Sequence, residues 1–357
     1  MKKIKALVLL SGGLDSILAV KILQEQEIEV TGVVFESNFF NAEKSKKAVK
    51  QLGISLKIID IRKDMLELVK NPPSGHGKNM NPCIDCHSLM IKKASEFLLP
   101  LAGGDRGGGD NEITPHSLPL KRRDYQIIAS GEVLGQRPFS QTKNALRRVE
   151  KIASVDVLRP LSAKLLPETI YEKKGLVDRD RLFGIEGRSR KQQIKLATKY
   201  KISEYPSPSG GCALTEFEFG EKLRQMIMNW PDCDIDDVEL LKHGRTYWIG
   251  KDFLIAVGRD ENSNKNLKKL SWKGDVIVEL KNKIGPTTLI RGKSRAISVK
   301  KIADRTLQIA ENFNSKDLKP QEDKSDEEIL ELAIKLSGRH APKVRGKQVD
   351  FILKIIK

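Results

Sequence analysis

The chain has 357 residues, enough for two domains of ordinary size. No apolar run approaches the roughly 20 residues that a membrane helix needs, which argues against a membrane protein. Lysine and arginine outnumber aspartate and glutamate by 64 to 47, a formal net charge of +17. This excess indicates either a polyanionic partner, nucleic acid before membrane, or simply a lysine-rich solvated surface. The basic N-terminus with its short apolar run lacks the cleavage site of a signal peptide, so a cytoplasmic location is expected.

The first part of the chain alternates between predicted strands and predicted helices. Strand patterns cover residues 5–10, 29–37, 55–61 and 124–132, and helix patterns cover residues 14–26 and 42–52. This rhythm is typical of an α/β protein with a Rossmann-like, doubly wound parallel sheet. Residues 99–123 carry Gly, Pro and Asp without periodicity, and we expect a flexible insertion there, either a lid or a disordered loop.

The predicted secondary-structure pattern changes in the later part of the chain. Residues 162–203 are predicted to be mostly helical, and residues 207–215 form a glycine-rich turn. Beyond about residue 218, short predicted strands alternate with helix patterns, and 314–325 is a polar linker. We therefore predict two domains: an α/β domain over residues 1–218 and a smaller α+β domain over residues 219–357.

The string SGGLDS, residues 11–16, joins the first strand to the first helix. Backbone N–H groups and the helix dipole favour an anion at this position. Gly12 and Gly13 allow close approach to a phosphate, and Asp15 is suited to capping the helix or to holding Mg2+. The simpler alternative is a plain strand–turn–helix with a Ser/Asp cap.

Cysteines form a second constellation. Cys83 and Cys86 make a C-x-x-C pair just ahead of a predicted helix, where the pKa of a thiol is expected to fall. With Cys212, in GGCALT, they suit three arrangements: a zinc site with His87 as fourth ligand, a persulfide-carrying pair, or an iron–sulfur cluster with one open iron. Cys233 has no evident partner and is expected to be an inert thiol.

The SGGLDS string resembles the pyrophosphate loop of the PP-loop ATP pyrophosphatases, the adenine nucleotide alpha-hydrolase superfamily. The string NMNPCIDC (79–86) and the later Gly-Gly-Cys resemble the tRNA thiolation branch, meaning the 4-thiouridine synthetase and 2-thiouridylase types. Further matching stretches cover most of residues 1–216: ASGEVLGQRPFSQ (129–141), LRPLSAKLLPET (158–169) and GIEGRSRKQQIKLA (184–197).

The resemblance implies an ATP-dependent tRNA sulfurtransferase that adenylates a uridine carbonyl and replaces its oxygen with sulfur, giving 4-thio- or 2-thiouridine. It implies ATP and Mg2+, with a four-iron four-sulfur cluster as one option. The implied partners are tRNA and a sulfur donor, which would be sulfide, a cysteine desulfurase or a sulfur carrier protein. A homodimer is one candidate assembly.

The resemblance also implies roles for individual residues. The implied ATP-binding residues are Ser11, Gly12, Gly13, Asp15, Ser16, Gly131, Glu132, Gln136 and Arg137. The implied catalytic residues are Asp15, Cys83, Cys86 and Cys212, the three cysteines also being the implied ligands of a cluster or zinc ion. Residues expected near the same cleft are Ser140, Arg188, Ser189 and Lys191.

The C-terminal domain is the expected source of RNA binding. The 4-thiouridine synthetases usually carry an RNA-binding region ahead of this fold, whereas here the first predicted strand begins near Lys5. HGRTYWIGKDFLIAVGRDENSNKNL (243–267) resembles the RNA-binding domain of NFACT proteins. The resemblance suggests RNA contacts by Lys251, Arg259, Asn262 and Asn266. A basic tail follows with Arg339, His340, Lys343, Arg345 and Lys347, and Tyr247 and Trp248 suit base stacking. The simpler alternative is a structural or dimerisation module whose aromatics are core.

Two other functions stay open at this point. One is a PP-loop ligase that makes a C–N bond on tRNA or on a small molecule, which needs no cysteine triad. The other is a non-catalytic RNA-binding protein with a degenerate nucleotide domain, against which the intact SGGLDS string argues.

Overall fold

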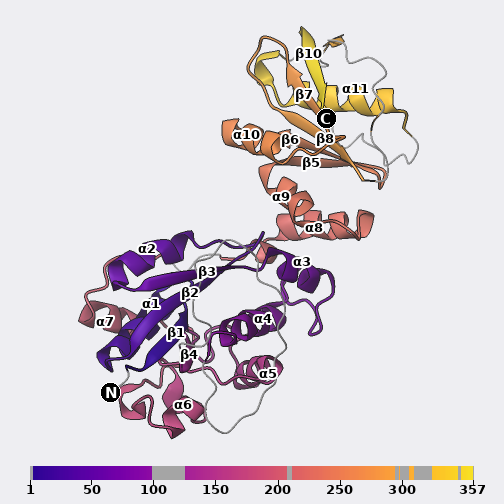
Figure 1. The fold of residues 1–357 in the computed structure, drawn as a ribbon. Coiled ribbons are helices and arrows are strands. Elements are labelled where there is room, and N and C mark those ends of the chain that lie inside the picture. The colour runs from indigo at the N-terminus through magenta and orange to yellow at the C-terminus, as the bar shows by residue number, and fades with distance from the viewer. Residues whose placement is uncertain are drawn as a thin grey trace. The chain divides into compact units, whose positions relative to one another are not determined.

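The structure is a computed structural model. It describes residues 3–98, 125–206, 211–293, 297, 305–308, 324–344 and 347–356. The chain divides into two compact units, Met1–Thr215 and Glu216–Lys357, each considered below by itself (Figure 1). The predicted insertion at residues 99–123 and most of the predicted linker at residues 314–325 lie outside the described residues.

A parallel sheet flanked by helices forms the first unit. Its described strands are β1 (Lys5–Leu9), β2 (Glu29–Glu36), β3 (Ser55–Asp60) and β4 (Ile127–Ser130). Its α-helices are α1 (Leu14–Glu25), α2 (Glu43–Leu52), α3 (Arg62–Lys70), α4 (Cys83–Ser95), α5 (Lys143–Ala153), α6 (Ile170–Lys173) and α7 (Lys191–Lys199). Short 3-10 turns are η1 (Ala163–Leu165), η2 (Arg179–Arg181) and η3 (Ala213–Thr215).

The strand order β3-β2-β1-β4 positions the site. All three strand pairs are parallel, so the carboxyl ends of the strands lie at one edge of the sheet. Since β2 and β3 lie on one side of β1 and β4 lies on the other, the chain reverses its winding between β1 and β4. Doubly wound sheets bind their ligands at such a switch point. The fully buried β4 and the apolar, buried face of α1 fix this edge in the core.

The second unit is built on an antiparallel sheet in the order β5-β6-β8-β7-β10-β9. The strands are β5 (Gly244–Ile249), β6 (Phe253–Gly258), β7 (Val276–Leu280), β8 (Thr288–Gly292), β9 (Arg305–Gln308) and β10 (Gln348–Ile355). The helical elements are α8 (Phe217–Asn229), α9 (Ile235–His243), α10 (Glu261–Lys269), α11 (Asp326–Arg339) and η5 (Pro342–Val344). One core joins α11 to the sheet.

The α/β fold class and the additional smaller domain are confirmed. The prediction that residues 162–203 are mostly helical is wrong, because only α6, α7 and two 3-10 turns form there. Apolar side chains of this segment, among them Val177, Leu182 and Ile185, instead pack into the sheet core from irregular backbone. Glycines with positive φ at 175 and 187 interrupt helical continuation. No helix in the described ranges has the length and apolarity to cross a membrane.

Candidate active site

Gly12 shapes the turn between β1 and α1. Its φ of +74° lies in the left-handed region, and a Cβ there would overlap the backbone of Lys44 at the start of α2. The Ser45 hydroxyl donates to the carbonyl of Leu10 (2.5 Å), which ties α2 to the end of β1. The conformation and packing of the turn therefore require glycine here even before a ligand is considered.

The first turn of α1 presents its amide groups without a capping side chain. Gly13 is the N-cap residue and makes no side-chain cap hydrogen bond. Its N–H donates to Ser11 Oγ (3.3 Å), while Ser16 Oγ donates to the Gly13 carbonyl (2.8 Å). Both hydroxyls thus brace the turn, and the backbone N–H groups of the helix start remain suited to an anion.

The end of β4 packs directly against this turn. A Cβ on Gly131 would overlap the backbone of Asp15 and Ser16, so glycine permits the close approach. The chain then forms a tight loop over residues 135–141, closed by a hydrogen bond from the Gly135 N–H to the Gln141 carbonyl (2.8 Å). A hydrogen bond from Gln136 to Asp15 connects this loop to the start of α1.

Asp15 is half-buried in the first turn of α1. Its Oδ2 accepts a hydrogen bond from Gln136 Nε2 (3.1 Å), whereas Oδ1 is buried and has no hydrogen-bond partner among the described residues. Burial raises the pKa of Asp15, and the Gln136 bond and the charges of Arg190 and Arg137 offset only part of that rise. An orphaned carboxylate oxygen beside a phosphate turn fits Mg2+, which binds through one or two carboxylates plus phosphates and water.

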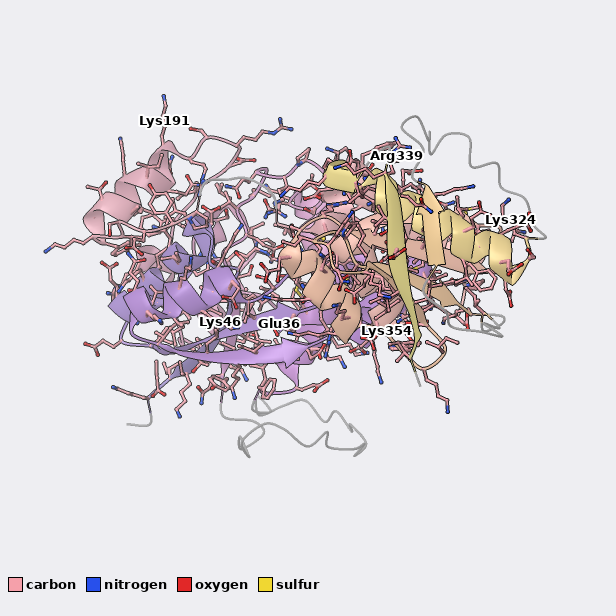
Figure 2. The ribbon with its side chains drawn as sticks, turned by 90° about the horizontal axis from the view of Figure 1, so that it is seen from above. Glu36, Lys46, Lys191, Lys324, Arg339 and Lys354 are labelled. Carbon is pink, nitrogen blue, oxygen red and sulfur yellow. The ribbon has the colours of Figure 1, made fainter. Side chains whose placement is uncertain are left out.

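Two residues that the sequence analysis did not single out lie beside Asp15. Arg190 immediately precedes α7, and Gln193 lies within its first turn. Both act on the Asp15 carboxylate, since each lowers its pKa. Helix α7 packs against α1, which explains how a distant segment reaches the site. The neighbours expected there from the resemblance, Arg188, Ser189 and Lys191, are instead exposed; Lys191 is labelled in Figure 2.

Glu132 belongs to a buried ion-pair network. Its Oε2 accepts from Arg159 Nε (3.0 Å) and from Ser130 Oγ (3.0 Å), and its Oε1 lies 2.9 Å from His87 Nδ1. Arg159 also bonds Glu150 (2.5 Å). Burial alone would raise the pKa of Glu132, but Arg159 and His87 together hold it well below its usual range. A role for Glu132 towards ATP would therefore be indirect.

The C-x-x-C pair begins α4, with Cys83 half-buried and Cys86 buried. Burial raises the pKa of both thiols, so the predicted lowering is wrong for the protein as it stands. Desolvation outweighs the favourable helix N-terminus. The charge of Arg137 and a hydrogen bond with Asn81 offset the rise at Cys83, whereas the neighbouring Cys212 and Cys83 add to it at Cys86.

Hydrogen bonds on the C-terminal side of Cys212 bring it near the C-x-x-C segment. The Ala213 N–H donates to the Phe39 carbonyl (3.0 Å), and Asn79 Nδ2 donates to the Thr215 carbonyl (2.7 Å). Asn79 precedes the C-x-x-C pair, so both cysteine segments meet there. Cys233 is buried in the second unit.

A metal centre is not formed by these side chains as they stand. Within the described parts of the chain, no three His, Cys, Asp or Glu side chains are grouped as metal ligands. His87, the suggested fourth zinc ligand, directs Nδ1 to Glu132. The three cysteines are therefore treated below as thiols, with Cys83 and Cys212 close enough to raise the pKa of Cys86.

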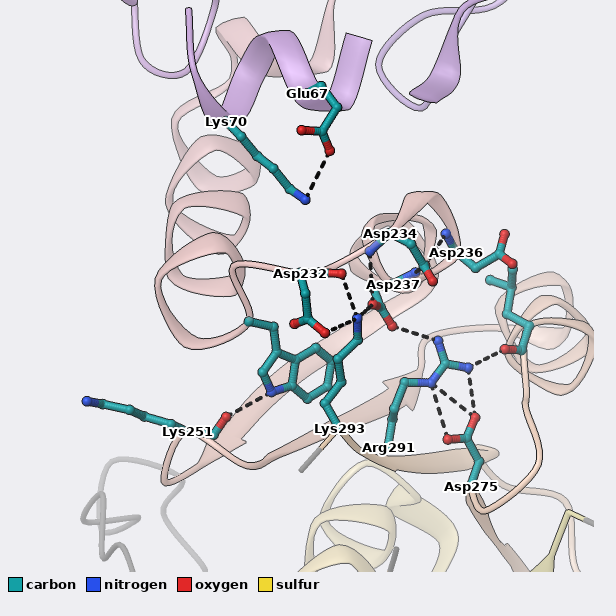
Figure 3. Close-up of polar contacts among 12 residues, drawn as sticks. Glu67, Lys70, Asp232, Asp234, Asp236, Asp237, Lys251, Asp275, Arg291 and Lys293 are labelled. Atoms are coloured by element: carbon teal, nitrogen blue, oxygen red, sulfur yellow. Dashed lines mark hydrogen bonds and ion pairs between the residues drawn. The ribbon is translucent and has the colours of Figure 1, made fainter. Parts of the chain in front are cut away.

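Of the proposed RNA contacts, Lys251 and Arg259 are exposed. The Lys251 carbonyl accepts a hydrogen bond from Trp230 Nε1 (2.8 Å), which fixes its backbone (Figure 3). Arg259 Nη2 donates to the Gly244 carbonyl (3.2 Å), so its guanidinium is held at the start of β5. Both side chains can reach a ligand from fixed backbone.

Side-chain contacts within this unit involve Asn266, Tyr247 and Trp248. Asn262 is exposed, but Asn266 Nδ2 lies 3.3 Å from His243 Nδ1. Tyr247 stacks on His340 and bonds its Nε2 (2.8 Å). Trp248 contacts Trp230 edge to face, with ring centroids 4.8 Å apart. Arg345 of the basic tail lies outside the described residues.

Some of the positive charge in this unit is neutralised internally. Arg291, 1% exposed, pairs with Asp275 (2.7 Å) and Asp237 (3.0 Å), and Lys293 also pairs with Asp237 (3.0 Å) (Figure 3). Cations that are paired in this way are not available to attract a polyanion. RNA binding would have to rest on exposed cations.

Comparison with known protein families first gives a match for the first unit. Residues 4–99 match the family model described as the tRNA methyl transferase HUP domain. The match, the parallel sheet and its glycine turn are consistent with a Rossmann-like PP-loop domain in the first unit.

Curated relatives are more specific. The chain is 30% identical over 169 residues to the tRNA-specific 2-thiouridylase MnmA of Campylobacter curvus, covering 45% of this chain and 46% of the relative. It is 38% identical over 89 residues to MnmA 2 of Fusobacterium nucleatum, covering 23% and 26%. The chain thus spans less than half the length of these relatives. Both relatives are named as tRNA-specific 2-thiouridylases.

Solved structures also match at low identity. A predicted subunit of tRNA methyltransferase from Methanocaldococcus jannaschii has a TM-score of 0.37 and 16% identity, covering 64% of this chain and 88% of that one. A 4-thiouridine synthetase–RNA complex with bound ATP has a TM-score of 0.31 and 18% identity, covering 67% and 52%.

Proposed function

We propose that the chain is an ATP-dependent tRNA sulfurtransferase that adenylates a uridine carbonyl and replaces its oxygen with sulfur. The observation that carries the proposal is the meeting of two chemistries at one sheet edge: an uncapped glycine turn for phosphate and three neighbouring thiols. The thiouridylase relatives support the same reaction class.

In the proposed first half-reaction, ATP lies with its phosphates at the start of α1. The uracil carbonyl oxygen attacks the α-phosphorus, the bond to the bridging oxygen breaks, and pyrophosphate leaves. The N–H groups of the first turn would stabilise the negative charge that develops on the phosphates. Mg2+, held by Asp15, would supply charge neutralisation for the leaving group.

In the second half-reaction, the terminal sulfur of a persulfide on one cysteine attacks the activated carbon, and AMP leaves with the former carbonyl oxygen. A second thiol then attacks the inner sulfur, which releases thiouridine and leaves a disulfide for an external reductant to open. The sulfur donor must supply the persulfide. Cys83 is the best-suited carrier, because it is half-buried and Arg137 favours its thiolate. Free cysteines and ATP use fit the cytoplasm.

RNA capture is proposed for a cluster of cations in the second unit. Burial lowers the pKa of Lys222, and the adjacent charges of Arg259 and Arg245 lower it further. Arg339 and Arg245 both oppose the burial-induced rise in the pKa of Tyr247, so their positive charges act on the same hydroxyl. Arg339 is labelled in Figure 2. Gathered like charges destabilise a free protein, and a phosphate backbone would relieve that repulsion.

The proposal is tested by anaerobic incubation with Mg-ATP, a persulfide donor and unthiolated tRNA, followed by nucleoside mass spectrometry. A 4-thiouridine or 2-thiouridine peak is expected, and its identity settles the position. Cys83→Ser should abolish the peak, whereas Cys233→Ser, the matched control, should keep it. Absence of both thionucleosides and of tRNA-dependent AMP release would refute the proposal.

A C–N ligase is the second candidate, because the uncapped glycine turn at the start of α1 would serve adenylation of either kind of substrate. It would release AMP with tRNA or a small-molecule acceptor, form no thionucleoside and keep full activity in Cys83→Ser.

A further inference from the structure

Helix α7 brings two polar side chains to Asp15 that the proposed chemistry above does not use. Gln193 is completely buried, and both its Nε2 and Oε1 lack a hydrogen-bond partner among the described residues. Arg190 Nε is buried and unpartnered in the same sense. Gln193 lies close enough to influence Asp15, yet forms no hydrogen bond of normal geometry with it.

Such a group of atoms is costly for a free protein. Buried amides are nearly always hydrogen-bonded, and each unsatisfied polar group loses its hydration without compensation. Here Asp15 Oδ1, Arg190 Nε and both amide atoms of Gln193 share this condition around one carboxylate. An arrangement of this kind is expected where a bound ligand completes the hydrogen bonds.

The chemistry of the four atoms identifies the ligand class. The guanidinium and the amide N–H are donors suited to phosphate oxygens, while the amide and carboxylate oxygens suit a hydrated divalent cation. The uncapped start of α1 adjoins them through Asp15. We propose that Arg190 and Gln193 form the second wall of a subsite for magnesium-bound pyrophosphate, facing the glycine turn. The inference rests on the proposed function, of which it names the product-binding residues.

Calorimetric titration with magnesium pyrophosphate, without RNA or a sulfur donor, tests the subsite. We expect Gln193→Leu to weaken binding at least tenfold, the loss typical of a hydrogen bond to a charged group. Gln192→Leu, the exposed neighbour on the same helix, should leave the affinity unchanged. The urea midpoint of Gln193→Leu should be unchanged or raised, because an apolar side chain removes the unsatisfied atoms.

The outcomes separate binding from structure. Equal pyrophosphate affinity of the wild type, Gln193→Leu and Gln192→Leu would overturn the inference, as would absence of binding to the wild type at millimolar ligand. If Gln193→Leu does not fold, Arg190→Gln carries the test, and an unchanged affinity overturns the inference. Since no thiol takes part, pyrophosphate binding can persist where sulfur transfer fails, so the two proposals fail separately.

Discussion

Replacement of Glu132 by Gln tests whether this residue serves the fold or the nucleotide. The carboxylate pairs with Arg159 (3.0 Å), whose side chain is 2% exposed, and with His87 (2.9 Å). Removing one charge from a buried pair typically costs about 3–5 kcal/mol. Glu150 still pairs with Arg159 in the variant, so we expect the lower end, about 3 kcal/mol.

Urea unfolding followed by circular dichroism measures this loss. With an m-value of about 2–3 kcal/mol per M, the midpoint should fall by about 1 M near neutral pH. The sign of the pH dependence follows from the lowered pKa of Glu132. Its stabilisation is present above the ordinary value of 4.5 and disappears as the pH falls below it. The difference between wild type and variant should therefore shrink in acid.

The result that would refute this reasoning is a variant with an unchanged midpoint and a sharply raised KM for ATP. That result would place Glu132 on the nucleotide, as the resemblance implied. Glu168→Gln is a suitable control, because its partly exposed carboxylate makes only a 3.9 Å pair with Arg179 and should cost less than about 1 kcal/mol.

Three further outcomes are expected. Gly131→Ala should destabilise the first unit by about 1–3 kcal/mol and abolish ATP binding, because its Cβ would overlap the α1 backbone. Thermal melting and nucleotide titration measure the two effects. Gly184→Ala is the control, because a Cβ there would make only ordinary contacts at 3.5 Å. Iodoacetamide should alkylate half-buried Cys83 at least about tenfold faster than buried Cys86 by peptide mass spectrometry, and equal rates would contradict the assigned burial. Arg245→Glu should weaken tRNA binding and flatten the dependence of log K on log salt by about 1, whereas an unchanged slope would remove this cation from the RNA surface.

The sheet and the glycine turn between β1 and α1 could be predicted because local signals agree there. An apolar strand, two glycines and an amphipathic helix follow each other without interruption, and β1, α1 and β2 form close to their predicted ranges. Gly12 gives the clearest case, since both its φ and its contact with Lys44 demand glycine. Local pattern and tertiary packing are consistent at this turn.

The residues beside Asp15 could not be predicted with the same ease, because α7 reaches the site through tertiary packing alone. Arg188, Ser189 and Lys191 carry more obvious chemistry, but it is Arg190 and Gln193 that face inward. The one sequence signal is helical spacing: Gln193 and Ala197, four residues apart, are the buried positions of α7. The thiol pKa values were mispredicted because helix position is visible in a sequence and burial is not.

The loop over residues 135–141 links the two halves of the proposed reaction. Gln136 binds Asp15, while the charge of Arg137 favours the ionised forms of both Asp15 and Cys83. Arg137 lowers the pKa of the Cys83 thiol most strongly when no other anion lies close to its guanidinium. In the proposed reaction, the negative charge of bound triphosphate would offset the charge of Arg137. Departure of pyrophosphate would restore the effect of Arg137 on the Cys83 thiol. Thiolate formation would then follow adenylation, which is the order that keeps the sulfur nucleophile from acting before the uridine is activated.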